Sequence, residues 1–480
     1  MAPYKEREPR MIADLAFLSV NEASTKLVQG EVSSLELTHA ALAQADRLEP
    51  HTTPLVHRLD ERALSEAEAS DERRRQNAPL GPLDGLPFTL KDIIDVAGVP
   101  TGAGSKVFDG NVPNRSATSA SLLEEAGSVL IGKARTHEFA WGGLTLPARN
   151  AWDADRIPGG SSGGSASGVA SGIGIFTLGT DTAGSVRSPA TFNGTVGLKP
   201  TYGKIGRSGV VPLAWSLDTV GVLARSVADT ALVYDTIAGP DPLDHTSIQT
   251  PHEAIAGNVG QDIAGLRIGV PDAYFFQTIQ EEVARQTQKG LDALEEAGAT
   301  LTSITLTPAE TIESALTSVF IIIGAESAAY HGDWIDSKRD LYGEDVLHYL
   351  DMGRALSATS YVDAQRARHL TTAAFNRAFE DVDVIVTPGQ GHIAPRVDEE
   401  MVNYSNGESI HRDPAGIRNL AVINLTGLPG LIVPTGLADG LPTGIQLVGP
   451  PLSQGLLLRA GRTVEDRVGY LGKRPPLAGS

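Results

Sequence analysis

The feature that most restricts this chain is a glycine- and serine-rich segment at residues 158–187, which reads PGGSSGGSASGVASGIGIFTLGTDTAGSVR. Two glycine-flanked serines, Ser161 and Ser185, lie 24 positions apart in it, joined by a small-residue helix pattern and an apolar strand pattern. By itself a GGSSGG run is more typical of a flexible linker. The small residues before Ser185 instead favour a loop whose backbone N–H groups can approach a substrate oxygen closely.

A third chemical group precedes this segment. Lys91 ends the sequence GLPFTLK that begins at Gly85. A lone lysine after a strand is usually a surface residue. Two serines and a lysine nevertheless suffice for nucleophilic acyl transfer without histidine or cysteine. Lysine serves as a base only when neutral, and burial among apolar neighbours such as Leu90, Ile93 and Ile94 lowers its pKa.

Composition excludes several classes of protein. The 480 residues are 41% hydrophobic and 20% charged, which is ordinary for a globular chain with a large core. A net charge of −19 disfavours binding to nucleic acid. The absence of cysteine excludes disulfides, thiolate zinc sites and the cysteine-dependent nitrilase-type amidases. Scattered histidines predict no metal site, and no cofactor is expected.

The N-terminus has no cleavable-leader pattern, and no run of about 18 apolar residues predicts a membrane span. We therefore expect a soluble, cytoplasmic protein without membrane contact.

Helix and strand patterns alternate along the chain. Ser33 and Glu36 form a capping box that opens a helix. Further helices are predicted over residues 63–75, 117–127 and 281–297. Strands are predicted at 86–90, 129–131, 172–178, 266–270, 382–386 and 431–433, and the polar residues 241–261 indicate an exposed connector. This alternation favours an α/β fold with a mixed or parallel sheet covered by helices.

The order and spacing of these groups resemble the amidase signature family, from about residue 35 to about residue 465. Further matching stretches are Gly132-Lys133, Glu138-Phe139-Ala140, GLKP at 197–200, Ser216-Leu-Asp218 and Gly444-Ile-Gln446. The resemblance implies the amidase signature fold, a large mixed β-sheet covered by helices on both faces. We expect this fold to form a single domain over residues 1–480. Its parts would be N-terminal helices (1–80), a catalytic core (81–240), a helical excursion (about 280–375) and C-terminal strands with a helix (380–470).

The resemblance also implies roles for individual residues. Ser185 is expected to be the nucleophile, Ser161 a relay serine preceded by a cis peptide bond, and Lys91 the base. We assign the oxyanion hole to the backbone amides of Thr182, Ala183, Gly184 and Ser185. We expect the remaining residues to position the loop or line the substrate pocket: Gly142, Gly143, Ser162, Thr180, Asp181 and Arg187.

Three functions stay open. The preferred one is a stand-alone amidase acting on small apolar or aryl amides, with carbamates and esters as further candidate substrates. The glutamine-cleaving component of a tRNA amidotransferase is the alternative, although GKARTHEFAWG at 132–142 departs from the GKTNMDEFAMG of those proteins and the loop to Asn150 is short. A non-catalytic binding homologue is the third. Homodimers are common in the family, so we expect one here.

Apolar residues near the glycine-rich segment indicate either a substrate pocket or ordinary packing. They are Trp141, Leu144, Leu146, Pro147, Val210, Val211 and Trp215. Arg207 lies in a glycine-containing stretch that suggests a mobile loop at the entrance of the cleft.

Overall fold

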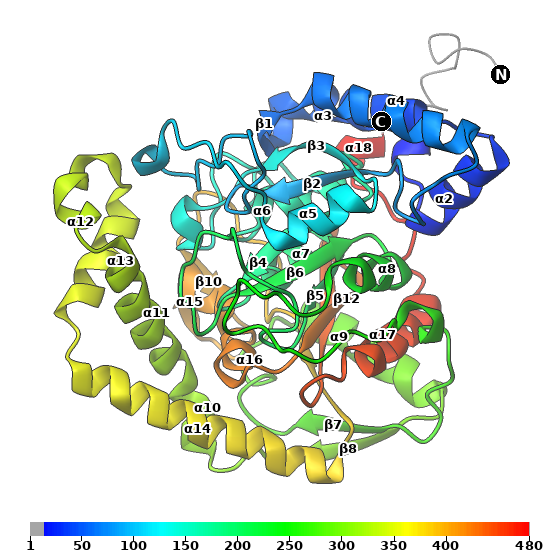
Figure 1. Ribbon diagram of the computed structural model, residues 1–480. Helices are drawn as coiled ribbons and strands as arrows, with labels where there is room; N and C mark the ends of the chain where they lie inside the picture. The colour runs from blue at the N-terminus through cyan, green and yellow to red at the C-terminus, as the bar shows by residue number, and fades with distance from the viewer. Residues whose placement is uncertain (1–13, 480) are drawn as a thin grey trace.

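A computed structural model describes residues 14–479, and one mixed sheet of eleven strands organises them (Figure 1). The strand order is β1-β3-β2-β4-β6-β5-β12-β13-β9-β7-β8. The strands are β1 (Leu55–Arg58), β2 (Pro87–Lys91), β3 (Val129–Ala134), β4 (Phe176–Asp181), β5 (Val196–Lys199), β6 (Thr219–Ala224), β7 (Arg267–Pro271), β8 (Thr300–Ile304), β9 (Val384–Pro388), β12 (Gly430–Ala438) and β13 (Leu441–Val448). Two short strands, β10 (Met401–Asn403) and β11 (Ser409–His411), pair separately.

Helices cover both faces of this sheet (Figure 1). One face carries α8 (Val227–Ile237), α9 (Glu281–Glu296) and α17 (Gln454–Val468), and the other carries α6 (Gly163–Ala170) and α7 (Arg187–Asn193). In β12, Leu431 and Val433 belong to the core on the α17 side, whereas Ile432 belongs to the core under α6 and α7. A strand buried on both faces needs such a continuous apolar run. The predicted α/β fold with a large mixed sheet is confirmed.

The remaining helices lie at the N-terminus and around the site. They are α2 (Val20–Gln29), α3 (Ser34–Thr52), α4 (Asp60–Arg75), α5 (Thr118–Glu125), α10 (Ala309–Glu313), α11 (Ala315–His331), α12 (Trp334–Ser337), α13 (Glu344–Ala355), α14 (Ala358–Asp381), α15 (Arg412–Ile417), α16 (Ala421–Thr426) and α18 (Pro476–Gly479), with 3-10 turns η2 (Lys106–Phe108), η3 (Glu138–Ala140), η4 (Ala256–Asn258) and η5 (Arg339–Leu341).

The predicted excursion near residues 280–375 contains α9, which packs on the sheet, and α10 to α14, which extend along one side of the molecule (Figure 1). Buried residues of α11 and α13 form a second apolar core together with Phe139 and Trp141. These helices therefore lie next to the loops that follow β3.

Most predicted elements are present, with two differences. The strand predicted at 172–178 begins only at Phe176, because Gly172 adopts a positive φ of 81° in a turn. The connector at 241–261 is mostly exposed, as predicted, but its first residues are anchored. Asp241 is 1% exposed and accepts the backbone N–H of Ser208, and Asp244 accepts that of Arg207. Acidic side chains at the start of this stretch serve as hydrogen-bond acceptors for the neighbouring loop, a role that polar composition alone does not indicate.

The contact between α11 and α13 makes a prediction about stability. A Cβ atom on Gly353 would overlap the carbonyl of Gly324 on the facing helix. We expect Gly353→Ala to lower the free energy of unfolding by about 1–3 kcal/mol, the usual cost of overpacking. Gly455→Ala in α17 is the matched control, since its new methyl would lie 3.4 Å from Ile255. Urea denaturation measures both, and a Gly353→Ala variant as stable as the wild type would contradict this contact.

Candidate active site

Three loops bring the predicted groups together at the ends of parallel strands. Lys91 is the last residue of β2, which pairs in parallel with β4. Ser161 lies in the turn before α6, and Ser185 lies between β4 and α7. Lys91 Nζ is 2.7 Å from Ser161 Oγ and 2.8 Å from Thr180 Oγ1. The lysine thus faces two hydroxyl groups in the interior, where its side chain is fully buried.

Burial determines the charge state of Lys91. Desolvation lowers the pKa of Lys91 to about 7, although the nearby carboxylates of Asp218 and Asp181 act in the opposite direction. No carboxylate forms an ion pair with Lys91 within the described part of the chain. A substantial fraction of the amine is therefore neutral near pH 7, which is the form that can accept a proton.

Hydrogen bonds hold the two serine loops together. The peptide bond between Gly160 and Ser161 is cis, as the resemblance implies. The Ser162 amide donates to the carbonyl of Ser185 (3.3 Å), and Ser162 Oγ is within hydrogen-bond distance of both backbone polar atoms of Thr180. The expected positioning roles of Ser162 and Thr180 agree with these contacts.

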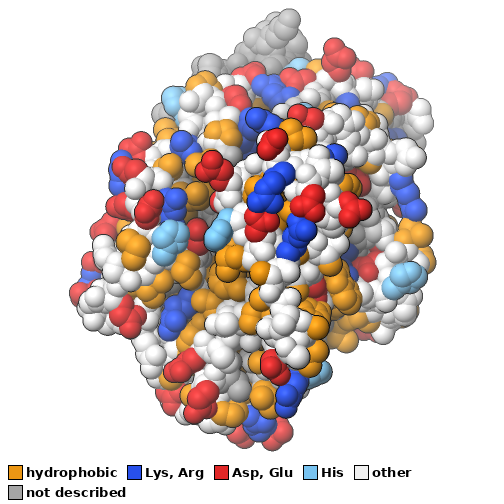
Figure 2. Space-filling model, turned by 90° about the vertical axis from the view of Figure 1, so that its left-hand side faces the viewer, with side chains coloured by type: hydrophobic (Ala, Val, Ile, Leu, Met, Phe, Trp, Pro, Cys, Tyr) orange, Lys and Arg blue, Asp and Glu red, His pale blue; other side chains and the backbone are white. Residues whose placement is uncertain are grey.

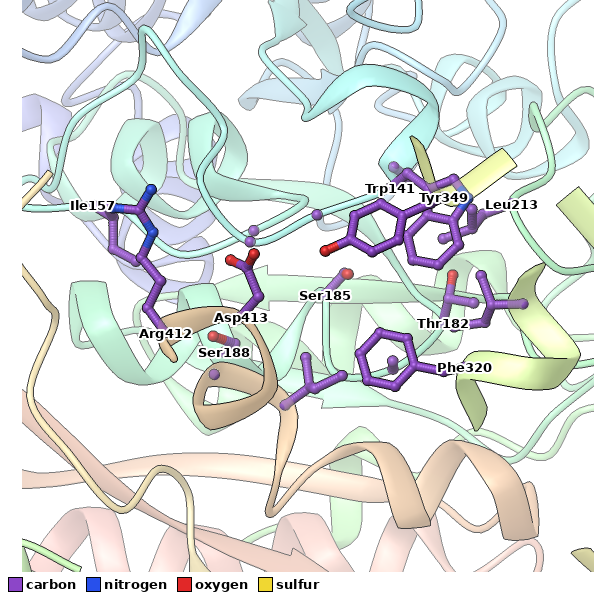
Figure 3. Close-up of a pocket in the computed structure, with 18 of the residues that line it drawn as sticks. Trp141, Ile157, Thr182, Ser185, Ser188, Leu213, Phe320, Tyr349, Arg412 and Asp413 are labelled. Carbon is purple, nitrogen blue, oxygen red and sulfur yellow. The ribbon is translucent and has the colours of Figure 1, made fainter. Parts of the chain in front are cut away.

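The hydroxyl of Ser185 faces a pocket (Figure 3). The residue is 8% exposed, and within residues 14–479 its hydroxyl makes no hydrogen bond, to Ser161 Oγ or to any other group. The Lys91–Ser161 pair is therefore formed in the structure, whereas the Ser161–Ser185 contact is not.

The four backbone amides assigned to the oxyanion hole differ in whether they already have a hydrogen-bond partner. The Gly184 amide donates to Asp181 Oδ1 at 2.8 Å, and a Cβ atom there would lie 2.7 Å from Leu420. Its φ of 122° also favours glycine. The amides of Thr182, Ala183 and Ser185 have no hydrogen-bond partner among the described residues, and all three residues line the pocket. Gly184 thus gives the loop its conformation, and its N–H, which binds Asp181, is not available to a substrate oxygen.

A buried ion pair fixes this loop. Arg187 Nη2 lies 2.9 Å from Asp181 Oδ1, and Asp181 also accepts the amides of Gly184, Val186 and Arg187. Burial alone raises the pKa of Asp181, but the Arg187 guanidinium, the charge of Lys199 and the hydrogen bond from Asn424 hold that pKa well below its usual range. The expected ion pair between Asp181 and Arg187 agrees with this geometry.

Sequence reasoning missed three polar partners of the loop. Gln446 accepts from Arg187 at 2.6 Å, and Asn424 bonds both Arg187 and Asp181. Asp218 accepts the hydroxyl of Thr182 at 2.6 Å together with the amides of Leu213 and Ala214. Gln446 and Asp218 stand in stretches that match the family, which was the available signal. Nothing in the sequence around Asn424 indicated this role.

The pocket encloses an empty volume of about 740 Å³, which includes its open mouth. Gly142 and Gly143 line it, as expected, and so does Trp141. The aromatic wall comes from Trp141 and Tyr349, whose rings stack with centroids 4.5 Å apart, and from Phe320 and Leu213 (Figure 3). Phe320 and Tyr349 belong to the helices α11 and α13, whose approach to the glycine-rich loop no local pattern indicates.

Other expected pocket residues lie elsewhere. Leu144, Leu146 and Pro147 line a separate hollow with Asp345. Val210 and Val211 pack in the core of the excursion, and Trp215 is 56% exposed. Of the two alternatives, a place in the substrate pocket holds for Trp141, and ordinary packing holds for Val210 and Val211.

Arg207 does not stand free at an entrance. Its backbone and side chain bind Asp244, and its guanidinium contacts the hydroxyls of Tyr202 and Thr246 and the carbonyl of Trp215. The loop that carries it is therefore tied to residues 241–247, contrary to the expectation of a mobile loop.

The described residues 14–479 contain no group of three or more His, Cys, Asp or Glu side chains arranged to hold a metal ion. Within the same residues, no helix combines the length and the apolar character needed to cross a bilayer.

Known proteins similar to this chain point to one family. The amidase family profile matches residues 36–458. The chain is 38% identical to the A component of the glutamyl-tRNA(Gln) amidotransferase from Chloroflexus aggregans, over 97% of this chain and 100% of that protein. It is also 38% identical to a Pseudomonas putida protein named amidase, over 98% of this chain and 100% of that protein.

Among solved structures, one chain comes from a vestigial protein complex that is linked to the evolutionary origins of an s-triazine catabolic enzyme. It matches with a TM-score of 0.89 and 32% identity, and covers 94% of this chain and 98% of that chain. The glycine-rich loop, the two-sided mixed sheet and these similarities agree, and the chain belongs to the amidase signature family of amide-bond hydrolases.

Proposed function

We propose that this protein hydrolyses small apolar or aryl amides through an acyl-enzyme formed on Ser185. The observation that carries the proposal is the 2.7 Å contact between the buried Lys91 amine and Ser161 Oγ, next to a pocket that Ser185 lines. A lysine held uncharged beside a serine can act as a general base. No cofactor is needed for this chemistry.

The reaction has two halves. In acylation, neutral Lys91 takes a proton from Ser161, Ser161 takes one from Ser185, and Ser185 Oγ attacks the carbonyl carbon. The tetrahedral intermediate collapses as the C–N bond breaks, the leaving nitrogen receives its proton from Ser161, and Lys91 returns a proton to Ser161. Water then hydrolyses the ester by the same proton path in reverse. The relay requires the Ser185 hydroxyl, which is free to rotate in the pocket, to reach Ser161 Oγ when substrate is bound.

The free amides of Thr182, Ala183 and Ser185 support an oxyanion hole. Donors fixed in advance stabilise the charge that develops on the carbonyl oxygen, and each is worth about 2.7–4 kcal/mol in comparable enzymes. The Thr182 hydroxyl bond to Asp218 and the Asp181 bonds to the following amides fix the loop before substrate arrives. Gly184 is not part of the proposed hole, because its N–H already binds Asp181.

The wall of Trp141, Tyr349, Phe320 and Leu213 supports an apolar acyl or aryl group as the substrate. Carbamates and esters present the same planar carbonyl and remain further candidates. The acidic chain is expected to act on a small molecule rather than on nucleic acid, and we propose a homodimer on the family resemblance alone.

The alternative is the glutamine-cleaving component of an amidotransferase, in line with the name of the Chloroflexus aggregans relative. The aromatic side of the pocket offers no partner to the α-ammonium and α-carboxylate groups of glutamine, so this alternative requires both groups to lie on the side of Asp413 and Arg412. The relative named amidase is equally identical to this chain.

Replacing the nucleophile tests the mechanism. Ser185→Ala should lower para-nitroanilide hydrolysis by about 10³-fold or more, since the attacking oxygen is lost. Ser161→Ala should lower it by about 10²-fold or more, because the proton path is broken. Ser167→Ala in α6, whose hydroxyl bonds only the carbonyl of Arg149, is the matched control and should keep turnover within a few-fold. Equal release of nitroaniline by the wild type and Ser185→Ala would remove the nucleophile assignment.

The pH profile tests the base. Because Lys91 acts when neutral and burial lowers its pKa to about 7, kcat/KM should rise as the pH increases through about 7 and level off above it. Thr180→Val removes a hydrogen-bond acceptor that favours the ammonium form, so the midpoint should move to lower pH.

Lys199 is the matched control, because burial lowers its pKa to about 7 as well, while its only hydrogen bond in the described residues goes to the carbonyl of Pro200. Lys199→Gln should keep the midpoint. If Lys199→Gln abolishes the rise in kcat/KM and Thr180→Val leaves the midpoint in place, Lys91 is not the base.

A glutaminase assay separates the two candidate functions. We expect anilide turnover by the protein alone and no appreciable ammonia release from glutamine. The control adds tRNA-handling partner proteins to the same assay. Partner-dependent glutaminase activity without any anilide turnover would replace the proposed function with the alternative.

A further inference from the structure

The pocket around Ser185 has two chemically different sides. Trp141, Tyr349, Phe320 and Leu213 lie on one side, whereas Asp413, Arg412 and Ile157 lie on the other, with Ser185 between them (Figure 3). The face of the molecule in Figure 2 shows acidic and basic side chains mixed with apolar ones, so this face carries no large patch of one charge that would select a small ligand. Selection must therefore come from groups inside the pocket.

The side chains of Asp413 and Tyr349, which line this pocket, have no hydrogen-bond partner among the described residues. The carboxylate of Asp413 accepts no hydrogen bond from any described residue, and the imidazole Nδ1 of His411, which lies 3.7 Å from it, accepts the backbone N–H of Asp413. The hydroxyl of Tyr349 likewise makes no hydrogen bond within residues 14–479. Burial raises the pKa of the Tyr349 hydroxyl, and the negative charges of Asp413 and Asp345 raise it further. Asp413 and Tyr349 both point into the space in front of Ser185 (Figure 3).

The neighbouring arginine does not neutralise this carboxylate. Arg412 Nη1 donates to the carbonyls of Val397 (2.9 Å) and Glu399 (2.8 Å), and no ion pair joins Arg412 to Asp413 in the described part of the chain. Its guanidinium lies beyond Asp413, next to Ile157 (Figure 3). A ligand group that extends from Ser185 meets Asp413 first.

The proton path indicates which part of the substrate reaches Asp413. The leaving nitrogen takes its proton from Ser161, so it must lie on the side of Gly160, which lines the pocket. Gly159 packs closely on Phe192, which forms one cluster with Ile157. This is the side that carries Asp413. With the leaving nitrogen on this side, the opposite, aromatic side is left for the acyl group, beside the oxyanion donor Thr182 (Figure 3).

We propose that Asp413 determines specificity for amides whose amine part carries a second, positively charged amino group. This inference rests on the proposed function. The preferred substrate is then an aromatic or branched apolar acid joined to one end of a short diamine. Its free ammonium binds the Asp413 carboxylate, with Tyr349 Oη as a second acceptor. Hydrolysis breaks the C–N bond and adds one water, giving the carboxylic acid and the diamine, whose new amino group takes the proton delivered by Ser161.

Isosteric substrates test this assignment. N-(4-aminobutyl)benzamide carries an ammonium where N-pentylbenzamide carries a methyl group, and N-benzoyl-5-aminopentanoate carries a carboxylate. The wild type should favour the cationic amide over the neutral one in kcat/KM by about five- to tenfold, the range of a partly desolvated charge pair. It should favour the anionic amide least.

Two variants locate the effect. Asp413→Asn should lower the cationic-to-neutral ratio of kcat/KM toward one, mainly through KM. Asp398→Asn removes the same charge from a side chain that is 79% exposed and outside the pocket, and it should keep the wild-type ratio. Circular dichroism checks that both variants fold.

The outcomes separate this inference from the function on which it rests. If the wild type hydrolyses the neutral amide in a Ser185-dependent manner without preferring the cation, or if Asp413→Asn keeps the preference, the specificity assignment is overturned and the amidase proposal stands. A preference for the anionic amide would assign selection to Arg412 and overturn it too. If none of the three amides is hydrolysed, and anilides are not hydrolysed either, the proposed function itself fails.

Discussion

The chemistry of this site depends on the free energy of placing one amine in the protein interior without a counterion. An ammonium group in that position is costly, so burial of Lys91 shifts its equilibrium toward the neutral base. The hydroxyls of Ser161 and Thr180 satisfy the amine through hydrogen bonds and bring no compensating negative charge. The position of β2 beside β4 delivers Lys91 to this environment, because the two parallel strands end at the same edge of the sheet.

The same region contains two buried charged groups that, unlike Lys91, do have a counterion. Asp181 and Arg187 are as deeply buried as Lys91, but they form an ion pair, and the guanidinium holds the pKa of Asp181 well below its usual range. This rigid pair holds the Gly184 amide and orients the amides of its neighbours. The loop therefore combines a fixed charge pair, which provides shape, with an uncharged lysine, which provides reactivity.

Local pattern was sufficient for much of this organisation. The glycine-rich loop, Lys91 and the Asp181–Arg187 pair lie within short stretches whose residue types restrict their chemistry, and the continuous apolar run of β12 predicts a strand buried on both faces. The aromatic side of the pocket could not be foreseen. Tyr349 and Phe320 come from helices more than 130 residues beyond the loop, and their approach depends on packing over that distance. The use of the Gly184 amide depends on a loop turn that the residue types leave open.

The central claim is that Lys91 is substantially neutral at physiological pH, and direct titration of its side chain tests it. Protein with ¹³C-labelled lysine ε-carbons gives one NMR signal for Lys91, assigned by its loss in Lys91→Met. Its chemical shift should titrate with a midpoint near 7, as burial without a counterion requires. A midpoint at or above the ordinary lysine value of about 10.4 would show a permanently charged ammonium and contradict its role as the base.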